Sequence, residues 1–388
     1  MLSPRQQLAR SKRPVIKVGS AVLAGDPKAR DAKAPDASFK ARIDSLCSEV
    51  AALAQRESSP RRFPTIVTSG AVALGVQTLG LPGRPKEMAL KQAAAAAGQS
   101  RLMRLYDDAF AERALISAQV LLTHADVAHR GRYLNARRAL GALLERGVVP
   151  VINENDTVSV EEIKFGDNDA LAAMVVDLVE ADLLVILTDA GGVFTADPRK
   201  DKRAQRISVI DRVTPAVEAL AGSPVSAGSA VGTGGMITKL RAARRATEAG
   251  VPCAIVAGEP LALQRLLAGE DIGTLVLPQG ERRTLRQRWM LDLKTRGELR
   301  VDDGARDAVV AGKKSLLPSG VREVVGSFAS GDPVAIAGLD GRAFARGLAV
   351  YGADEVRRIA GLKSSAIETR LGYRLLDCVV HRDDLVVT

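Results

Sequence analysis

Five short runs of apolar and β-branched residues, each followed along the chain by a longer segment rich in Ala and Leu, constrain the fold most strongly. The short runs span residues 14–20, 64–70, 148–153, 182–189 and 252–258. Apolar residues at helical spacing mark the longer segments, at residues 37–56, 86–113, 132–146, 168–180 and 235–249. This alternation is typical of a parallel sheet with helices on both faces. We therefore predict an α/β fold, a parallel-sheet αβα sandwich.

The pattern changes after about residue 280 to short β-prone runs separated by Gly, Pro and Asp. Such runs predict a second, small β-rich domain. A division into two domains also fits the length of 388 residues, which is long for a single core. We expect one domain over residues 1–280 and another over 281–388, with the boundary near the charged stretch Gly280–Arg283.

Charge and cysteine usage restrict the class of protein. The formal net charge of +10 is spread along the chain and favours an anionic partner, which nucleic acid, nucleotide or an acidic metabolite would equally satisfy. Cys47, Cys253 and Cys378 lie far apart, which argues against a zinc site and a disulfide framework. The basic N-terminus lacks the apolar run of a signal peptide, and no segment approaches the ~20 apolar residues of a membrane span. We expect a cytoplasmic protein that does not bind membranes.

The stretch GTGGMITK, residues 232–239, stands at the start of a predicted helix. It does not match GxxxxGK[ST], because no glycine precedes Lys239 and Thr238 comes before the lysine. Nor does it match GxGxxG, because Ile237 occupies the position of the third glycine. A glycine-rich helix start with free N–H groups can still bind an anion, and Lys239 adds positive charge one turn in. By itself the stretch is better explained as a glycine turn beside a surface lysine.

A second lysine is predicted at the same edge of the sheet. Lys17 follows an apolar strand and precedes Gly19, and ligands of such sheets gather beyond the carboxyl ends of the strands. A strand-end lysine is ordinarily a solvated charge. Two lysines at one edge, each beside a glycine that lets the backbone approach a ligand, could instead clamp a transferring phosphoryl group.

Amides and carboxylates concentrate near the same edge. Asp167–Asp169 stand at a predicted helix start, where helix capping accounts for one of the three residues. Asn153, Asn155 and Asp156 follow a predicted strand. Together these side chains could bind the ammonium group of an amino acid, its carboxylate, or a metal on phosphate oxygens.

Histidine is scarce. His124, His129 and His381 are the only histidines, and none adjoins a Ser or Cys motif, so Ser/His/Asp and Cys/His catalysis are poorly supported. Phosphoryl transfer to a carboxylate fits better, because that nucleophile is already ionised at neutral pH and needs no general base.

Six segments together resemble the glutamate 5-kinase family, which has the amino acid kinase fold. In chain order, between residues 15 and 277, they are VIKVGS, VTSGAVALG, PVINENDTV, EIKFGDNDAL, LTDAGGVFTADPR and GTGGMITK. The C-terminal part resembles a PUA domain, an RNA-binding fold that many bacterial glutamate 5-kinases carry.

The resemblance implies ATP-dependent phosphorylation of the side-chain carboxylate of L-glutamate, giving L-glutamyl 5-phosphate and ADP in the first step of proline biosynthesis. It also implies Mg2+, a homo-oligomer (dimer or tetramer), feedback inhibition by proline, and a hand-off of the product to glutamate-5-semialdehyde dehydrogenase.

The resemblance further implies roles for particular residues. Lys17 and Lys239 would stabilise the phosphoryl group, and Asp169 would orient both lysines. The residues implied for glutamate are Ser69, Asp156 and Asn168. Those implied for ATP are Lys17, Thr188, Asp189, Thr233, Gly234, Gly235, Met236, Ile237, Thr238 and Lys239, with Phe194–Pro198 flanking the nucleotide. Ala21 departs from the family, which more often has a second hydroxyl residue there, so one hydroxyl contact to phosphate is in doubt.

The sequence leaves two alternatives open. The first is another kinase of the same fold, acting on aspartate, acetylglutamate, carbamate or UMP, because the fold alone does not decide the acceptor. The second is an RNA-binding protein acting through residues 281–388. That part carries 19 Lys and Arg against 15 Asp and Glu, a balance of only +4, and lacks clustered aromatic residues, which makes sequence-specific RNA recognition a poor fit.

Overall fold

The computed structural model describes residues 2–24, 35–55, 61–158, 168–198, 201–220, 235–279, 295–312 and 314–387. The chain forms two compact units, Met1–Arg282 and Arg283–Thr388. The boundary stretch expected at residues 280–283 lies outside the described residues. No helix in the described ranges is both long and apolar enough to cross a membrane.

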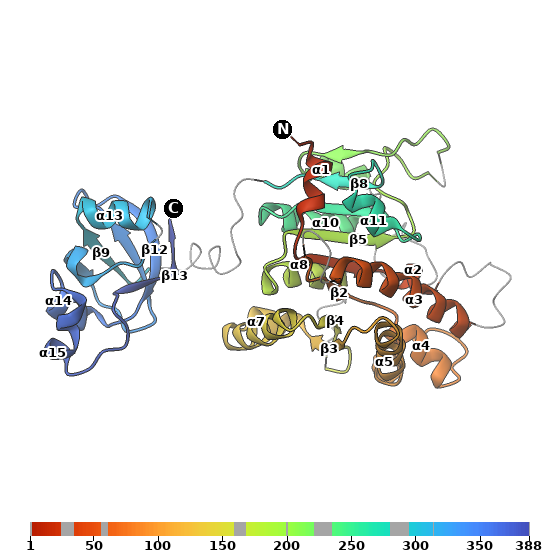
Figure 1. The fold of residues 1–388 in the computed structure, drawn as a ribbon, viewed down its shortest axis with the longest axis horizontal. Coiled ribbons are helices and arrows are strands. Elements are labelled where there is room, and N and C mark those ends of the chain that lie inside the picture. Colours follow the sequence, from red (N-terminus) through yellow and green to blue (C-terminus); the bar gives the residue numbers. More distant parts are fainter. Residues whose placement is uncertain are drawn as a thin grey trace. The chain divides into compact units, whose positions relative to one another are not determined.

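The described part of the larger unit contains an eight-stranded sheet in the order β3-β4-β2-β1-β5-β7-β8-β6. The strands are β1 (Pro14–Val18), β2 (Thr65–Val67), β3 (Ser117–Leu122), β4 (Val149–Glu154), β5 (Leu183–Thr188), β6 (Val209–Ile210), β7 (Cys253–Ala257) and β8 (Thr274–Val276). Every neighbouring pair is parallel except β7 with β8. Figure 1 shows the labelled strands one below another, from β8 to β3.

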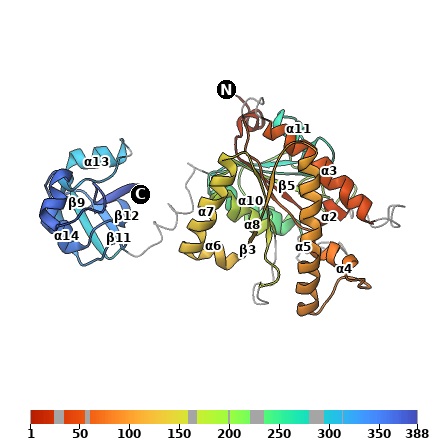
Figure 2. The same cartoon turned by 60° about the horizontal axis from the view of Figure 1, so that its bottom comes forward.

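Helices cover both faces of this sheet (Figure 2). One apolar core lies between the sheet and the helices α7 (Arg130–Glu145), α8 (Asn168–Leu178) and α10 (Met236–Glu248). The other lies between the sheet and α3 (Pro35–Ala54), α5 (Met88–Ala111) and α11 (Ala262–Leu267). The shorter elements are α1 (Pro4–Gln7), η1 (Leu8–Arg10), α2 (Ser20–Ala24), α4 (Ala71–Thr78), α6 (His124–Ala128) and α9 (Pro215–Leu220).

The position of Lys17 in strand β1 determines the face of the sheet to which its side chain points. All five of its residues are buried, as expected for a strand that is covered on both faces. Val15 belongs to the core beside α8, and Ile16 and Val18 belong to the opposite core. Because side chains alternate along a strand, Lys17 points to the side of α8.

Helices α4 and α5 approach each other closely at two glycines. A Cβ atom at Gly75 would lie 1.7 Å from the carbonyl oxygen of Ala94, and one at Gly98 would lie 1.9 Å from that of Ala71. Only glycine fits at such distances.

The predicted strands and helices of the larger unit are present, with shifted ends. Strand β3 was missed in the sequence because it is only partly buried at the edge of the sheet and lacks a continuous apolar run. The predicted parallel sheet is present, but β8 runs antiparallel to β7, and β6, which pairs with β8 in parallel, shares its direction. The connection from β7 to β8 spans residues 258–273 and contains the short helix α11.

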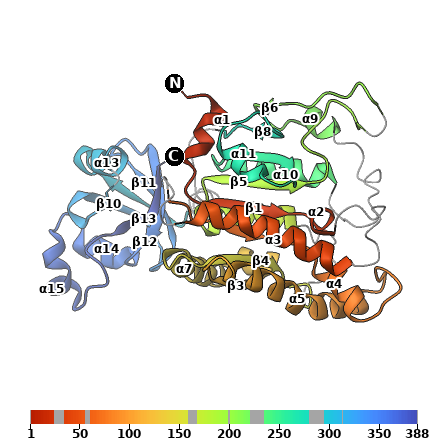
Figure 3. The ribbon, with the colours of Figure 1, turned by 45° about the vertical axis from the view of Figure 1, so that its right-hand side comes forward.

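The smaller unit is β-rich, as predicted (Figure 3). Its sheet has the order β10-β9-β11-β12-β13, and every pair is antiparallel except β9 with β11. The strands are β9 (Gly297–Val301), β10 (Val321–Gly326), β11 (Pro333–Ala337), β12 (Ala343–Ala349) and β13 (Val380–Val387). Its helices are α13 (Asp303–Val310), η3 (Pro318–Gly320), α14 (Ala353–Ile359), η4 (Ser364–Ala366) and α15 (Ile367–Leu371). Leu299, Ile336, Tyr351 and Val356 belong to its apolar core.

Candidate functional site

A buried cluster of charges lies where β1, α8 and α10 meet. Lys17 Nζ is 2.5 Å from Asp169 Oδ1, and Lys239 Nζ is 3.4 Å from Asp169 Oδ2. The Asp169 side chain is fully buried, and those of Lys17 and Lys239 are only 5% and 8% exposed. The two lysines, 222 positions apart in the sequence, thus share one carboxylate.

Local structure explains why these side chains converge. Asp169 lies in the first turn of α8, and Lys239 lies in the first turns of α10, which begins after the N-cap residue Gly235. Thr238 Oγ1 is 2.8 Å from Asp169 Oδ2 and also 2.8 Å from the carbonyl oxygen of Gly235. The carboxylate therefore connects the starts of two helices to a central strand.

The electrostatics of the cluster favour an anion beside it. Burial alone would raise the pKa of Asp169, but the adjacent Lys17 and Lys239 ammonium groups, with the Thr238 hydroxyl, hold that pKa well below its ordinary value. Two ammonium groups and one carboxylate leave a net charge of +1 at the edge where two helices begin. Helix N-termini add partial positive charge, so the site suits a phosphoryl group.

Beside this cluster lie residues predicted to bind the amino acid substrate. Asn168 Nδ2 donates to Ser69 Oγ at 3.0 Å and to Asn153 Oδ1 at 3.1 Å. Asn153 also accepts from the backbone N–H of Glu154 at 2.9 Å and donates to Gln99 Oε1 at 2.8 Å. Ser69 and Asn168 are therefore in direct contact, although 99 residues separate them along the chain.

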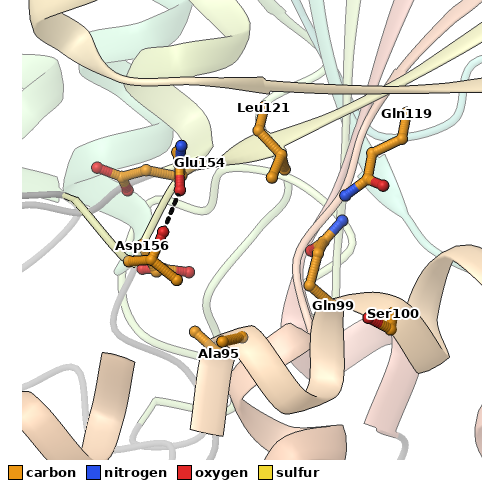
Figure 4. A pocket seen from close by; sticks show the side chains of 10 residues that line it. Ala95, Gln99, Ser100, Gln119, Leu121, Glu154 and Asp156 are labelled. Atoms are coloured by element: carbon orange, nitrogen blue, oxygen red, sulfur yellow. Dashed lines mark hydrogen bonds between the residues drawn. The ribbon is translucent and has the colours of Figure 1, made fainter. Parts of the chain in front are cut away.

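Asp156, the third residue predicted for the substrate, lines a pocket with a volume of about 220 Å³. The pocket lies between α5, β3 and the segment that follows β4, and Figure 4 shows Asp156 and Glu154 on one side of it and Gln99 and Gln119 on another. Burial raises the pKa of Asp156 to about 6, and the Glu154 carboxylate adds to this increase, while Lys91 and Arg84 oppose it. Asp156 therefore changes its charge within the range of ordinary assay buffers.

The described residues predicted to contact ATP lie at the end of β5 and at the start of α10. Thr188 ends β5 and is buried, Asp189 is exposed, and the Thr188 hydroxyl donates to Asp189 Oδ1 at 3.1 Å. Phe194–Pro198 follow β5, with Phe194 bridged to Arg206. Gly235 is the N-cap of α10, and Met236, Ile237 and Thr238 form its first turn. Thr233, Gly234 and Asp167 lie outside the described residues.

Sequence reasoning missed the part played by Gln99. Helix α5 was recognised as a good helix former because of its alanine run, and no motif marks a glutamine within it. Gln99 connects to Asn153 only because α5 packs over the carboxyl end of β4. The contact of Thr238 with Asp169 was likewise not foreseen, since the motif assigned Thr238 only to ATP.

The chemical capacity of the site is the neutralisation and positioning of anions. Two buried ammonium groups face the edge where helix N-termini and hydroxyl groups gather, an arrangement that suits phosphoryl transfer. Among the described residues, no group of three or more His, Cys, Asp or Glu side chains could hold a metal ion by itself.

Comparison with known proteins identifies similar chains. The amino acid kinase family model matches residues 12–257, and the PUA domain model matches residues 297–371. A glutamate 5-kinase of Myxococcus xanthus is 50% identical over 385 residues, which cover 99% of this chain and 98% of the relative. A glutamate 5-kinase of Syntrophotalea carbinolica is 50% identical over 382 residues, covering 98% of each chain. The solved structure of an isopentenyl phosphate kinase of T. acidophilum aligns with 68% of this chain and 100% of its own, at 18% identity and a TM-score of 0.45.

Proposed function

This chain belongs to the amino acid kinase family and, within it, to the glutamate 5-kinases, and we propose that Lys17, Lys239 and Asp169 form its phosphoryl-transfer centre. The protein phosphorylates the side-chain carboxylate of L-glutamate with ATP in proline biosynthesis. The expected amino acid kinase fold and C-terminal PUA domain are confirmed by the same matches. The sharing of the buried Asp169 by two lysines is the observation that carries the proposed centre.

In the proposed mechanism, an oxygen of the glutamate side-chain carboxylate attacks the γ-phosphorus of ATP. The bond from that phosphorus to the β–γ bridging oxygen breaks, and ADP leaves with the electron pair. No proton moves, because the carboxylate is already ionised at neutral pH. Lys17 and Lys239 stabilise the charge on the phosphoryl oxygens during transfer. Asp169 contacts both lysines, so it positions two like charges that would otherwise repel each other.

We assign glutamate to Ser69, Asn168 and Asp156. The direct contact between Ser69 and Asn168 supports a common binding site for these two residues. The Asp156 carboxylate, when ionised, would attract the ammonium group of the amino acid. Asp156 follows β4, and Asn153 of that strand contacts Asn168, which supports placing all three on one substrate.

We assign ATP to Thr188, Asp189 and the residues from Thr233 to Lys239. The N-terminus of α10 supports this assignment, because its free backbone N–H groups can bind phosphate oxygens. Mg2+ would enter with ATP and neutralise phosphate charge. With no cluster of three metal-binding side chains among the described residues, phosphate oxygens and water would supply most of its ligands, which is usual for Mg2+.

The assay of choice traps the acyl phosphate with hydroxylamine and measures the hydroxamate. With ATP and Mg2+, the full chain should form hydroxamate from glutamate, and UMP should not stimulate ADP release. Aspartate and acetylglutamate serve as matched acceptors. Phosphorylation of UMP while glutamate stays inert would overturn the proposal.

Several further properties are proposed on the family assignment. We propose that proline inhibits the enzyme, that the chain forms a dimer or tetramer in the cytoplasm, and that glutamate-5-semialdehyde dehydrogenase receives the product. Adding proline to the hydroxamate assay tests the first, and light scattering of the purified protein tests the oligomeric state. Both substrates would bind within residues 1–280, and residues 281–388 would be regulatory or structural rather than RNA-binding.

A further inference from the structure

Three side-chain amides form a row from the proposed substrate residues into helix α5. Asn168 donates to Asn153 Oδ1 at 3.1 Å, and Asn153 donates to Gln99 Oε1 at 2.8 Å. We infer that Gln99, Asn153 and Asn168 act as an amide relay, in which Gln99 is a positioning residue that helps to determine which atom of Asn168 faces glutamate. This inference rests on the proposed function, in which Asn168 contacts glutamate.

One backbone N–H group and Gln99 hold the two ends of the Asn153 amide and together set the direction of the amide relay. An amide side chain can exchange its nitrogen and oxygen by turning over, unless its partners distinguish the two atoms. The backbone N–H of Glu154 lies 2.9 Å from Asn153 Oδ1, and a backbone N–H can only donate. The oxygen of Asn153 must therefore face Glu154, so that its nitrogen faces Gln99. Gln99 Oε1 accepts from Asn153 Nδ2, so Gln99 holds the nitrogen end of the Asn153 amide.

The relay leaves Asn168 with only an acceptor for a ligand. Its nitrogen carries two hydrogens, and these are used by Ser69 Oγ and Asn153 Oδ1. Asn168 Oδ1 is buried and has no hydrogen-bond partner in the described ranges of the chain. At neutral pH the α-ammonium is the only hydrogen-bond donor of glutamate, because both carboxyl groups are ionised. Asn168 Oδ1 therefore accepts from the α-ammonium group.

Ser69 takes the complementary part. Its oxygen accepts from Asn168, and its hydroxyl hydrogen has no acceptor among the described residues, so it can be donated to a carboxylate of glutamate. Ser69 and Asn168 thus distinguish the negative and positive ends of the substrate. The relay favours an amino acid over a dicarboxylate of the same length without an ammonium group, such as glutarate.

The chain offers a matched control for Gln99. Gln119 of β3 lines the same pocket, and Figure 4 shows the two side chains pointing toward each other. Gln119 is exposed and forms no hydrogen bond with the described residues of the amide relay. Replacing either glutamine removes one amide from the lining of the same pocket, but only Gln99 supplies an acceptor to Asn153.

The test compares Gln99→Met and Gln99→Glu with Gln119→Met and Gln119→Glu in the full chain. Methionine keeps the length of the side chain and removes the acceptor, whereas glutamate keeps an acceptor. Hydroxamate formation is measured with glutamate and with glutarate at saturating ATP. In Gln99→Met we expect the KM for glutamate to rise about tenfold, about 1.4 kcal/mol, with the KM for ATP unchanged. The preference for glutamate over glutarate, as a ratio of kcat/KM values, should fall by a similar factor.

The remaining variants decide the outcome. Gln99→Glu should match Gln119→Glu within about threefold, because the acceptor is retained and both variants add the same charge. Equal effects of Gln99→Met and Gln119→Met, or an unchanged preference for glutamate in Gln99→Met, would overturn the inference. If Gln99→Met does not fold, Gln99→Asn is used instead, because its side chain is one methylene shorter and moves the acceptor oxygen away from Asn153. This variant must show the same loss of preference for glutamate over glutarate. A wild-type chain that is inactive on glutamate would instead refute the proposed function, before any variant is compared.

Discussion

Replacement of Lys239 by methionine tests the proposed phosphoryl-transfer centre most directly. Methionine retains the unbranched, apolar stem and removes the ammonium group. Asp169 keeps its contact with Lys17 at 2.5 Å and with Thr238 at 2.8 Å, so no buried charge loses its last partner. The variant should therefore fold, and a loss of activity would report on chemistry.

The expected magnitude follows from the charges of the cluster. Lys17, Lys239 and Asp169 together carry +1, and Lys239→Met reduces this charge to zero. A unit charge about 4 Å from a phosphoryl oxygen contributes ~4 kcal/mol at an effective dielectric constant of about 20. Loss of that term from the transition state lowers the rate about 10³-fold. Removal of a single donor to a developing oxyanion in other enzymes lowers the rate by a similar ~10²–10³-fold.

The assay measures kcat by hydroxamate formation at saturating ATP and glutamate, together with the thermal unfolding midpoint. Lys202→Met is a suitable control, because Lys202 is exposed and is not one of the proposed site residues. We expect kcat to fall about 10³-fold in Lys239→Met and to stay unchanged in Lys202→Met. A folded Lys239→Met enzyme with kcat within tenfold of wild type would show that Lys239 does not stabilise the phosphoryl group.

Three other perturbations have outcomes that follow from the structure. Because the pKa of Asp156 is about 6, protonation of its carboxylate below that pH should lower kcat/KM for glutamate. The pH profile of Asp156→Asn should lack this fall at acidic pH. An identical pH profile in both proteins would contradict the assignment of Asp156 to glutamate binding. Asp169→Asn should lower the free energy of unfolding by about 3–5 kcal/mol, because it removes the buried negative charge that two buried ammonium groups share, and added ATP should reverse part of that loss in thermal unfolding. Gly98→Ala should lower the free energy of unfolding by roughly 1–3 kcal/mol or more through overpacking. Gly141→Ala, where the added Cβ meets open space, should instead stabilise helix α7 by about 0.5–1 kcal/mol. Equal changes in the free energy of unfolding would refute the close contact between helices α4 and α5.

Much of the fold could be read from local patterns. Four buried strands are recognisable in the sequence as apolar runs: β1, β4, β5 and β7. A strand that is covered on both faces of a sheet needs apolar side chains on both faces. Strand β3 does not, because an edge strand is only partly covered and its sequence, SAQVLL, mixes polar and apolar residues. The reversed direction of β8 depends on tertiary packing, which no short-range pattern encodes.

The candidate site divides in the same way. The sequence by itself predicted Lys17 and Lys239 as an anion site, because strand ends and helix starts are local features that suit anion binding. The predicted roles of Asp169, Ser69 and Asn168 came from the family resemblance. The contacts between these residues could not be predicted from the sequence. Whether two lysines share one carboxylate depends on how α8 and α10 lie against β1.

Only the tertiary structure decided how the side-chain amides of the candidate site hydrogen-bond to one another. Gln99 is an unremarked residue in an alanine-rich helix, and it gains a role because α5 brings it within 2.8 Å of Asn153. A hydrogen bond between side chains depends on distances of a few tenths of an ångström, and these arise from the packing of whole helices. The sequence alone thus specifies the residue types at the candidate site, whereas the fold decides which hydrogen-bonding atoms of these side chains contact one another.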